Sequence, residues 1–340
     1  MNTKSFLNLV IITFLMVVFA FFSINFNFQN YNFESRGEVF LKNFTNNIND
    51  VTVISIESFD NTLDLIKQDN NYISKSGYPL KIGIWENLIT SLSILRIEEK
   101  KTKDPKRHSE LNLLSPELNK SEDESEGYAY KITLKKKDGS VYKSILFGKI
   151  DPSVGGLSGG QFARIANQNQ SYLLKGGIRM PSSRSDWFES LLFTIKNDDF
   201  KSAELKNDKK IFKIENFDKS LKVTFPKFLS IKIDETKLNQ VREVINGFYF
   251  YDVRQSSGTN LAELPTLTYE TKNGLTLSLS SVGENKGKET WIKIKANFKK
   301  PEAKGLSKKI NNKTTGFEFL ANINTSDILL WNSNNFESND

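Results

Sequence analysis

The longest apolar stretch of the chain lies at its beginning. Residues Phe6 to Ile24 are apolar except for Asn8, Thr13 and Ser23. As a helix that rises about 1.5 Å per residue, this stretch would be roughly 28 Å long, about the thickness of a bilayer's hydrocarbon core. A cleaved signal peptide usually has a shorter apolar stretch that ends in a small-x-small motif, and neither feature is clear here. We therefore predict that residues 1–24 form an uncleaved transmembrane anchor, with a cleaved signal peptide as the alternative.

The charges around this stretch predict its orientation. Lys4 and the α-amino group precede it, and no Lys or Arg follows until Arg36. Because positive charge is retained on the cytoplasmic side, the amino terminus should stay in the cytosol. We expect a single-pass inner-membrane protein whose carboxy-terminal body lies in the periplasm of a Gram-negative bacterium.

Short segments with strand patterns follow an Asn- and Phe-rich tether at residues 25–50. Val51 to Glu57 alternates β-branched and polar residues, which is typical of a half-buried strand. Tyr130 to Lys135 and Val141 to Phe147 surround Asp138-Gly139, a strong hairpin signal. A second predicted hairpin joins Gln161–Ala166 to Ser171–Leu174 through Asn167-Gln168-Asn169.

Apolar residues spaced three and four apart predict two amphipathic helices, each covering a sheet. The first carries Ile82, Trp85, Leu88, Ile89, Leu92 and Leu95, with Pro79 near its start. The second follows Asp234 and carries Leu238, Val241, Val244, Ile245 and Phe248. Ser183 and Asp186 also resemble a capping box, which predicts a short helix from that point with Trp187, Leu191, Leu192 and Ile195 inward.

The second half of the chain repeats the order of the first. A hairpin signal at Asn273-Gly274, for example, follows that at Asp138-Gly139, and matching features lie about 135 to 155 positions apart. We predict an α+β fold of two related modules of antiparallel β-hairpins, at residues 51–198 and 199–340, each covered by an amphipathic helix. A chance resemblance between two ordinary hairpin-helix-hairpin orders is the alternative to a duplication.

Composition excludes several chemistries. Among 340 residues there is one His and no Cys, so a zinc site of Cys and His, a cysteine nucleophile and a disulfide are excluded. The formal charge of +7 is dispersed, because basic runs such as Lys135 to Lys137 are followed at once by acidic residues. We interpret these charges as solvated faces and expect no nucleic-acid partner. Attraction to an anionic surface or polymer is the alternative.

The string Leu157-Ser158-Gly159-Gly160-Gln161 looks like the signature motif of ABC-transporter ATPases. That motif places backbone N–H groups at a helix amino terminus against a nucleotide phosphate held by a P-loop. The chain contains no Gly-x-x-x-x-Gly-Lys-Ser/Thr sequence, and Phe162 to Ala166 has a strand pattern. We therefore interpret the string as a glycine-rich loop between strands.

No catalytic, cofactor or metal site is predicted. His108 lies in a polar segment that predicts an exposed turn, and neither Gly-x-Ser-x-Gly nor Ser-x-x-Lys occurs in a convincing context. The paired carboxylates Glu98-Glu99 and Asp198-Asp199 are adjacent and so point in different directions. The tryptophans, at positions 85, 187, 291 and 331, fall on predicted apolar faces. This position favours core packing over a sugar-binding surface.

The first module contains an ordered set of short motifs: Gly77-Tyr78-Pro79, Leu95-Arg96-Ile97-Glu98, Thr102-Lys103-Asp104-Pro105, Leu111-Asn112-Leu113, Asp138-Gly139, Leu146-Phe147-Gly148-Lys149, Phe162-Ala163-Arg164, Ser171-Tyr172-Leu173-Leu174 and Asp186-Trp187. Taken in this order, the set resembles a bacterial family called domain of unknown function 4340. The resemblance covers roughly Val51 to Ile195. The chain departs from the pattern where Asn112 replaces a Gly, a tolerable change at a left-handed turn, and where His108 replaces an aromatic residue.

The resemblance implies an envelope protein often found beside ABC transporters of the gliding-motility auxiliary type, without assigned catalytic residues. We expect a non-enzymatic, membrane-anchored extracytoplasmic accessory or scaffold protein. It would contact an ABC transporter permease or its auxiliary extracytoplasmic subunit through sheet edges or the loops near Gly155 to Gly160. A module that binds cell-envelope polymer is the alternative, and a cryptic hydrolase using Ser or carboxylates is a third.

Overall fold

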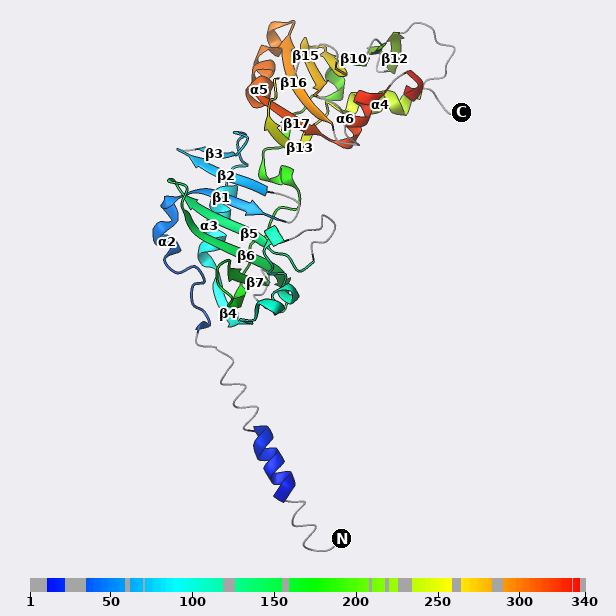
Figure 1. Cartoon of the computed structure of the whole chain (residues 1–340). Helices are drawn as coiled ribbons and strands as arrows, with labels where there is room; N and C mark the ends of the chain where they lie inside the picture. The colour runs from blue at the N-terminus through cyan, green and yellow to red at the C-terminus, as the bar shows by residue number, and fades with distance from the viewer. Residues whose placement is uncertain are drawn as a thin grey trace, which may run out of the picture. The chain divides into compact units, whose positions relative to one another are not determined.

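The computed structural model divides the chain into two compact units (Figure 1). The first contains residues 1–70 and 85–180, and the second contains residues 71–84 and 181–340. The described residues are 11–21, 35–58, 62–69, 71–118, 126–154, 159–207, 210–217, 220–225, 234–258, 264–282, 290–331 and 333–336. Each unit combines an antiparallel sheet with few helices, which confirms the predicted α+β class.

The amino-terminal segment is described only in part. Residues 11–21 form a helix, and large apolar side chains such as Phe14 and Phe19 are exposed on it. Among the described residues, none of the helices combines the length and apolar character needed to cross a bilayer. The remainder of the predicted span, residues 6–10 and 22–24, lies outside the described residues, as do positions 25–34 of the predicted tether. The later part of that tether is folded, and Leu41 and Phe44 are buried there.

The first unit is built on an antiparallel sheet, and the strand predicted at Val51 to Glu57 is present. Its strands are β1 (Val51–Glu57), β2 (Thr62–Gln68), β4 (Arg96–Lys100), β5 (Tyr130–Lys136), β6 (Val141–Asp151), β7 (Gly160–Ile165) and β8 (Ser171–Lys175). The sheet also contains β3 (Asn71–Ser74) at one edge, and its order is β3-β2-β1-β5-β6-β7-β8-β4. The two predicted hairpins, β5–β6 and β7–β8, are confirmed. Gly139 has a φ of 82° in the first of their turns, which explains the glycine there.

The first predicted helix is present but begins later than its apolar pattern suggests. Helix α3 (Ile84–Ile94) buries Trp85 and Leu92, among others. Ile82, predicted on the apolar stripe, is instead 90% exposed, and Pro79 lies in a β-bridge. Gly83 explains the late start, because its φ of 79° is incompatible with a continuing right-handed helix. That this helix covers the sheet stays a prediction.

A connection of short 3-10 turns joins β4 to β5. The turns are Pro105–Arg107, Ser109–Leu111 and Pro116–Leu118. Asp104 caps the first, because its side chain accepts a hydrogen bond from the backbone N–H of Lys106 at 3.0 Å. Residues 119–125, which follow these turns, lie outside the described residues.

The second unit is built on a larger set of strands. They are β9 (Leu191–Phe193), β10 (Phe200–Asn207), β11 (Lys210–Phe217), β12 (Ser220–Phe225), β13 (Phe248–Gln255), β14 (Thr266–Thr271), β15 (Leu275–Ser281), β16 (Trp291–Phe298) and β17 (Phe317–Ala321). Its sheet has the order β12-β11-β10-β14-β15-β16-β17-β13-β9. The helices are α4 (Glu235–Glu243), α5 (Lys304–Thr314) and α6 (Ile323–Leu330).

The division between the units differs from the predicted boundary at 198/199 in two segments, residues 71–84 and 181–198. Residues 71–84 join the second unit, where Tyr78 makes edge-to-face contacts with the rings of Phe188, Phe250, Phe317 and Phe319. The Ser183 capping box is confirmed, but its helix is a single 3-10 turn, Arg184–Trp187. Leu191 then starts β9, which pairs with β13 and so belongs to the second sheet.

The two sheets repeat one strand order. Each strand of the first sheet except β3 has a counterpart in the second: the order β2-β1-β5-β6-β7-β8-β4 corresponds to β11-β10-β14-β15-β16-β17-β13. Corresponding strands have corresponding neighbours and follow each other in the same order along the chain. Register irregularities repeat as well. They fall between Val51 and Val53 in β1 and between Phe200 and Ser202 in β10, and between Ile97 and Glu99 in β4 and between Phe250 and Asp252 in β13. This correspondence supports the predicted duplication, which remains an inference about ancestry.

Candidate functional site

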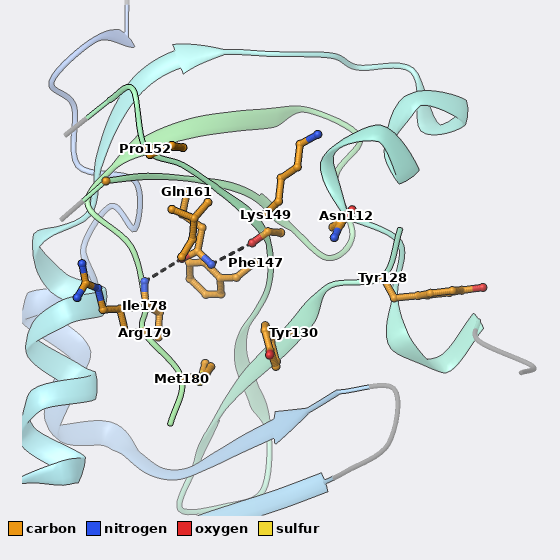
Figure 2. A pocket seen from close by; sticks show the side chains of 13 residues that line it. Asn112, Tyr128, Tyr130, Phe147, Lys149, Pro152, Gln161, Ile178, Arg179 and Met180 are labelled. Carbon is orange, nitrogen blue, oxygen red and sulfur yellow. Dashed lines mark hydrogen bonds between the residues drawn. The ribbon is translucent and has the colours of Figure 1, made fainter. Parts of the chain in front are cut away.

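An open pocket of about 650 Å³ lies in the first unit. Figure 2 shows residues 178–180 on one side of it, Lys149 and Asn112 on the other, and Phe147 and Gln161 between them. Residues 147–150 of β6 and Gln161 of β7 are among its lining residues. The pocket therefore depends on how these neighbouring strands pair.

An irregularity in β6 creates the pocket. The pairing of β6 with β7 shifts between Phe147 and Ile150, which leaves Gly148 and Lys149 outside the regular ladder. The buried side chain of Gln161 takes over part of the lost hydrogen bonding. Its Nε2 donates to the carbonyl oxygen of Gly148 at 3.1 Å, and its Oε1 accepts from the backbone N–H of Ile178 at 2.8 Å. Gln161 thereby joins β6 to the segment on the opposite side of the pocket.

Strand β5 leaves β6 at the same point. The last pair between these strands is Tyr130 with Phe147, although β6 continues to Asp151. Before Tyr130, the backbone N–H of Ala129 donates to the carbonyl oxygen of Leu114 at 2.9 Å. Ala129, at the end of the β4–β5 connection, thus pairs with Leu114 earlier in the same connection. Residues 148–151 of β6 extend past the last β5 pair.

Close backbone packing requires the glycine in this strand. A Cβ atom on Gly148 would lie 2.1 Å from the carbonyl oxygen of Leu111. Asn112 follows with a φ of 54°, which confirms the left-handed turn expected where this residue replaces glycine. The turn at Leu111 and Asn112 therefore rests directly on β6 and forms one wall of the pocket.

His108 is buried, and the prediction of an exposed turn was wrong. Only 2% of the residue is exposed, and its Nε2 lies 2.9 Å from the carbonyl oxygen of Asn169 in the β7–β8 turn. Burial holds the pKa of His108 below its ordinary value. The prediction failed because the polar residues around His108 belong to the β4–β5 connection, which packs against the β7–β8 turn. The imidazole is buried there and has a backbone carbonyl as its partner. His108 lies outside the pocket lining and serves to position its wall.

Arg164 supports the same wall from β7. Its Nε donates to the carbonyl oxygen of Leu113 at 3.0 Å, and its Nη1 donates to that of Ala166 at 2.8 Å. Burial lowers the pKa of Arg164. The guanidinium thus connects the β4–β5 connection with the end of β7, and its hydrogen bonds to backbone carbonyls explain how a half-buried cation is tolerated there.

The string that resembles an ATPase signature contributes to this pocket. Residues 155–158 lie outside the described residues, and Gly159 and Gln161 line the pocket. From Gly160 the chain is strand β7, whereas the ATPase motif requires a helix at this point. The predicted strand at Phe162 is therefore confirmed.

The chemistry of the pocket is cationic and aromatic. Lys149 and Arg179 are exposed, and Tyr130 is 45% exposed. Among the described residues that line the pocket there is no Asp, Glu, His, Ser or Thr. Nor does the described part of the chain contain a cluster of His, Cys, Asp and Glu that could hold a metal ion. The arrangement is suited to binding a ligand through charge, ring faces and backbone groups.

The tryptophans divide into two groups. Trp85 and Trp187 are buried, as expected of core residues. Trp291 and Trp331 are only partly buried, and each has a cation over its ring. Arg254 Cζ lies 4.2 Å from the centroid of the Trp291 ring, and Lys237 Nζ lies 5.0 Å from that of Trp331. Burial in the core is thus confirmed for the first pair, and the second pair is half-buried, with the Trp331 ring against that of the buried Phe336.

Comparison with known families identifies the chain. The family described as "Domain of unknown function (DUF4340)" matches residues 72–265, more than half of the sequence. The chain belongs to this family. The match confirms the resemblance and extends it well into the second unit, and it includes the whole pocket lining. Curated proteins and solved structures give no match.

Sequence reasoning did not identify the pocket residues as a group. Gly148 and Lys149 belong to a motif that carried the family resemblance, but nothing in the motif indicates a pocket. Arg179 and Tyr130 come from segments far apart in the chain. Both line the same pocket because the fold brings these segments together.

Proposed function

We propose that this DUF4340 protein is a non-enzymatic, membrane-anchored accessory or scaffold protein, and that the pocket of the first unit docks part of its partner. One observation carries the proposal. The largest irregularity of the first sheet exposes cations, tyrosine rings and strand backbone, and the described lining contains no carboxylate, imidazole or hydroxyl nucleophile other than tyrosine. Such a lining favours recognition over acid–base or nucleophilic chemistry.

The amino-terminal sequence supports the anchor. The apolar run from Phe6 to Ile24 has the length of a bilayer core. Its described part is helical, with Phe19 78% exposed, and lipid would cover such side chains. With Lys4 on the cytoplasmic side, the folded units would be extracytoplasmic and the protein a single-pass inner-membrane protein.

The family resemblance suggests the partner. Proteins of this kind often occur beside ABC transporters, so we propose an ABC transporter permease or its auxiliary extracytoplasmic subunit. Both would be accessible to a tethered body on the extracytoplasmic side. The single anchor keeps that body at high local concentration beside membrane partners, which favours weak but specific docking.

Crosslinking and purification of the full chain in mild detergent tests the partner. The wild type should recover an ABC permease or its extracytoplasmic subunit. Combined Lys149→Glu and Arg179→Glu should reduce this recovery at least about tenfold, since both pocket cations are reversed. Lys175→Glu is the matched control, because Lys175 is exposed on β8 outside the pocket lining, and should leave recovery unchanged. Recovery of the protein alone under crosslinking contradicts the proposal.

A topology reporter tests the anchor separately. A reporter enzyme that is active only outside the cytosol, fused behind Asp340, should be active and remain in the membrane fraction. An inactive reporter, or a freely soluble mature product, contradicts the proposed location.

Binding of a cell-envelope polymer is the second candidate, and one observation favours it. A pocket of about 350 Å³ in the second unit is lined by amide, carboxylate and ammonium groups around Trp331. These include Asn324, Asp327 and Lys237, and mixed donors and acceptors beside an indole suit a sugar ring. Sedimentation with purified envelope polymer, weakened by Trp331→Ala, would support this function; no sedimentation contradicts it.

A further inference from the structure

We propose that helix α5 of the second unit docks through its exposed basic face on the anionic headgroup layer of a phospholipid bilayer. The basic face consists of Lys304, Lys308, Lys309 and Asn312. This inference rests on the membrane anchor of the proposed function and adds a second contact between the chain and the bilayer. Its basis is the concentration of positive charge at α5 and the lack of acidic side chains on the strands that pack against this helix.

Positive charge is concentrated in one segment of the second unit. Residues 299–313 contain six Lys and one Glu, which give a net charge of +5, whereas the whole chain has a formal net charge of +7. The acidic residue, Glu302, precedes α5 in the 3-10 turn Pro301–Ala303. Charges elsewhere in the sequence largely cancel, so this segment is where attraction to an anionic surface is most favoured.

The helical period places three of these lysines on the solvent side of α5. With about 3.6 residues per turn, positions 304, 308 and 312 follow one another along the helix, and position 309 lies beside them. All four residues are exposed. The buried residues of α5 lie on its other side: Ser307, Ile310 and Thr314. A face of lysine and asparagine without a large apolar side chain suits electrostatic contact with headgroups rather than insertion into hydrocarbon.

The elements around α5 leave these charges uncompensated. In the described part of the chain, Lys304, Lys308 and Lys309 form no ion pair. Strands β9, β15 and β16 pack against α5, and none of them contains Asp or Glu. Strand β16, which lies beside the helix (Figure 1), instead adds the exposed Lys295. The face therefore has a positive potential that a partner of opposite charge would neutralise.

The shape of this face favours a bilayer over a small anion. Its lysines lie on a convex helix and cannot enclose a small ligand, whereas a flat layer of headgroup phosphates can contact all of them at once. Lysine is a flexible point charge and does not require one fixed phosphate geometry. Each lysine near an anionic bilayer favours adsorption about fivefold, and three together about a hundredfold. The proposed anchor would hold α5 at high local concentration beside such a surface.

Energy transfer from α5 to the bilayer surface tests the inference. Because the chain has no Cys, Asn312→Cys provides a single site for a donor fluorophore. The full chain is reconstituted into vesicles with acceptor-labelled headgroups, made of phosphatidylcholine alone or mixed with phosphatidylglycerol. Transfer should be higher in the anionic vesicles, and high salt should reduce it to the neutral value because exposed charges are screened. A donor at Asn324→Cys, exposed on α6, should show a smaller difference.

Charge reversal on α5 supplies the test variant. Combined Lys304→Glu, Lys308→Glu and Lys309→Glu should weaken adsorption at least about a hundredfold and thus abolish the difference between the two lipids. These side chains are exposed, so the fold should be retained, which circular dichroism checks. The comparison of lipids and salt without charge reversal needs no such variant and remains decisive if this one does not fold.

Three lysines of the first unit supply the matched control. Combined Lys103→Glu, Lys137→Glu and Lys175→Glu changes the net charge by the same amount, and all three residues are exposed. This variant should keep the difference in transfer between neutral and anionic vesicles. A loss as large as that of the α5 variant would show that overall charge, and not α5, attracts the bilayer, and it overturns the inference.

The outcomes separate this inference from the proposed function. Equal transfer in neutral and anionic vesicles at low salt overturns docking at α5, whether or not the permease is recovered. If transfer is equal while the chain, but not its α5 variant, sediments with an anionic envelope polymer, the face binds polymer and the inference fails. If the reporter behind Asp340 is inactive while transfer still rises with phosphatidylglycerol, the proposed location fails and the lipid contact stands.

Discussion

The two units use the same strand order but differ where β6 and β7 correspond to β15 and β16. In the second unit, β15 and β16 pair without a break from Leu275 with Phe298 to Ser281 with Ile292. In the first unit, the pairing shifts after Phe147, and the pocket lies at that shift. A regular ladder satisfies its own backbone groups, whereas an interrupted one leaves them for side chains or ligands.

The connections that follow these strands differ too. The second unit inserts α5 after β16, and Figure 1 shows this helix beside that strand. Asn311 of α5 binds the backbone of Ala296 twice: its Oδ1 accepts from the N–H at 2.9 Å, and its Nδ2 donates to the carbonyl oxygen at 2.7 Å. The first unit has only a short turn after β7. The second unit thus has a helix packed against β16, whereas the first has a short turn at the corresponding place.

The largest effect is expected at Tyr78, which tests how the chain is divided between the units. Tyr78→Ala should lower the free energy of unfolding of the second unit by about 3 to 5 kcal/mol, because four aromatic rings lose their partner. Hydrogen exchange should increase across the second sheet. Tyr249→Ala, at a 53% exposed site, is the control and should change stability by less than about 0.5 kcal/mol. Faster exchange confined to the first unit would contradict this assignment.

The next largest effect is expected from removing a buried carboxylate of the second unit, which has no counterpart among the described residues of the first. Glu318 in β17 is 0% exposed and accepts hydrogen bonds from Ser257 N and from Arg254 Nε, both at 2.8 Å. Glu318→Ala should cost about 2 to 4 kcal/mol, because these donors lose their acceptor. Thermal unfolding measures the loss.

The corresponding position in the first unit provides the matched control. Ser171, at the start of β8, is also 0% exposed, and its Oγ donates to the carbonyl oxygen of Thr102 at 2.8 Å. Ser171→Ala should cost only about 1 kcal/mol, because one neutral hydrogen bond is lost. Equal losses of stability for the two substitutions would show that the buried charge of Glu318 contributes no more than the neutral hydroxyl of Ser171.

A pair of glycines should give effects of opposite sign. Gly148→Ala should destabilise the first unit by about 1 to 3 kcal/mol, because the new methyl group would meet the carbonyl oxygen of Leu111. Gly305→Ala should instead stabilise the second unit by about 1 kcal/mol, since this residue lies in α5 with open space around its Cβ position. Both changes can be followed by chemical denaturation. Destabilisation by Gly305→Ala would contradict the described surroundings of α5.

The smallest expected effect is the loss of stability of the second unit at low pH. Burial alone would raise the pKa of Glu318, but the hydrogen bonds from Ser257 and Arg254 outweigh it and hold the pKa below its ordinary value. The stabilisation is therefore complete above the unfolded-state pKa of a glutamate and is lost as pH falls through that value toward the lower folded one. Exchange in the second sheet should increase over this window, and Glu318→Gln should abolish the dependence. An unchanged pH profile in that variant would assign the effect to other groups.

Local patterns accounted for the elements whose signals are themselves local. The hairpins at Asp138-Gly139 and at Asn167 to Asn169 are confirmed, because turn chemistry and alternation act over a few residues. The helix after Gly83 is confirmed with a later start, since one positive φ outweighed the apolar position of Ile82. The ordered motifs, read together, were sufficient to identify the family.

The pocket and the burial of His108 could not be predicted in this way. His108 is buried by a turn more than sixty positions away, against Asn169, and its polar neighbours in sequence carry no sign of that contact. The pocket depends on a register shift in β6 and on β5 ending at Tyr130. No single segment encodes either event, because each is set by how three strands and a connection fit together.

The sequence by itself determined the class of fold, the hairpins, the family and the absence of cysteine chemistry, since these follow from residue type and short-range spacing. Tertiary structure decided which residues meet. It assigned Tyr78 to the second unit, buried Glu318 among its donors, and placed Lys149 and Arg179 on one rim. Backbone hydrogen bonds must be satisfied across the whole sheet, so only the complete pairing shows where a strand remains open.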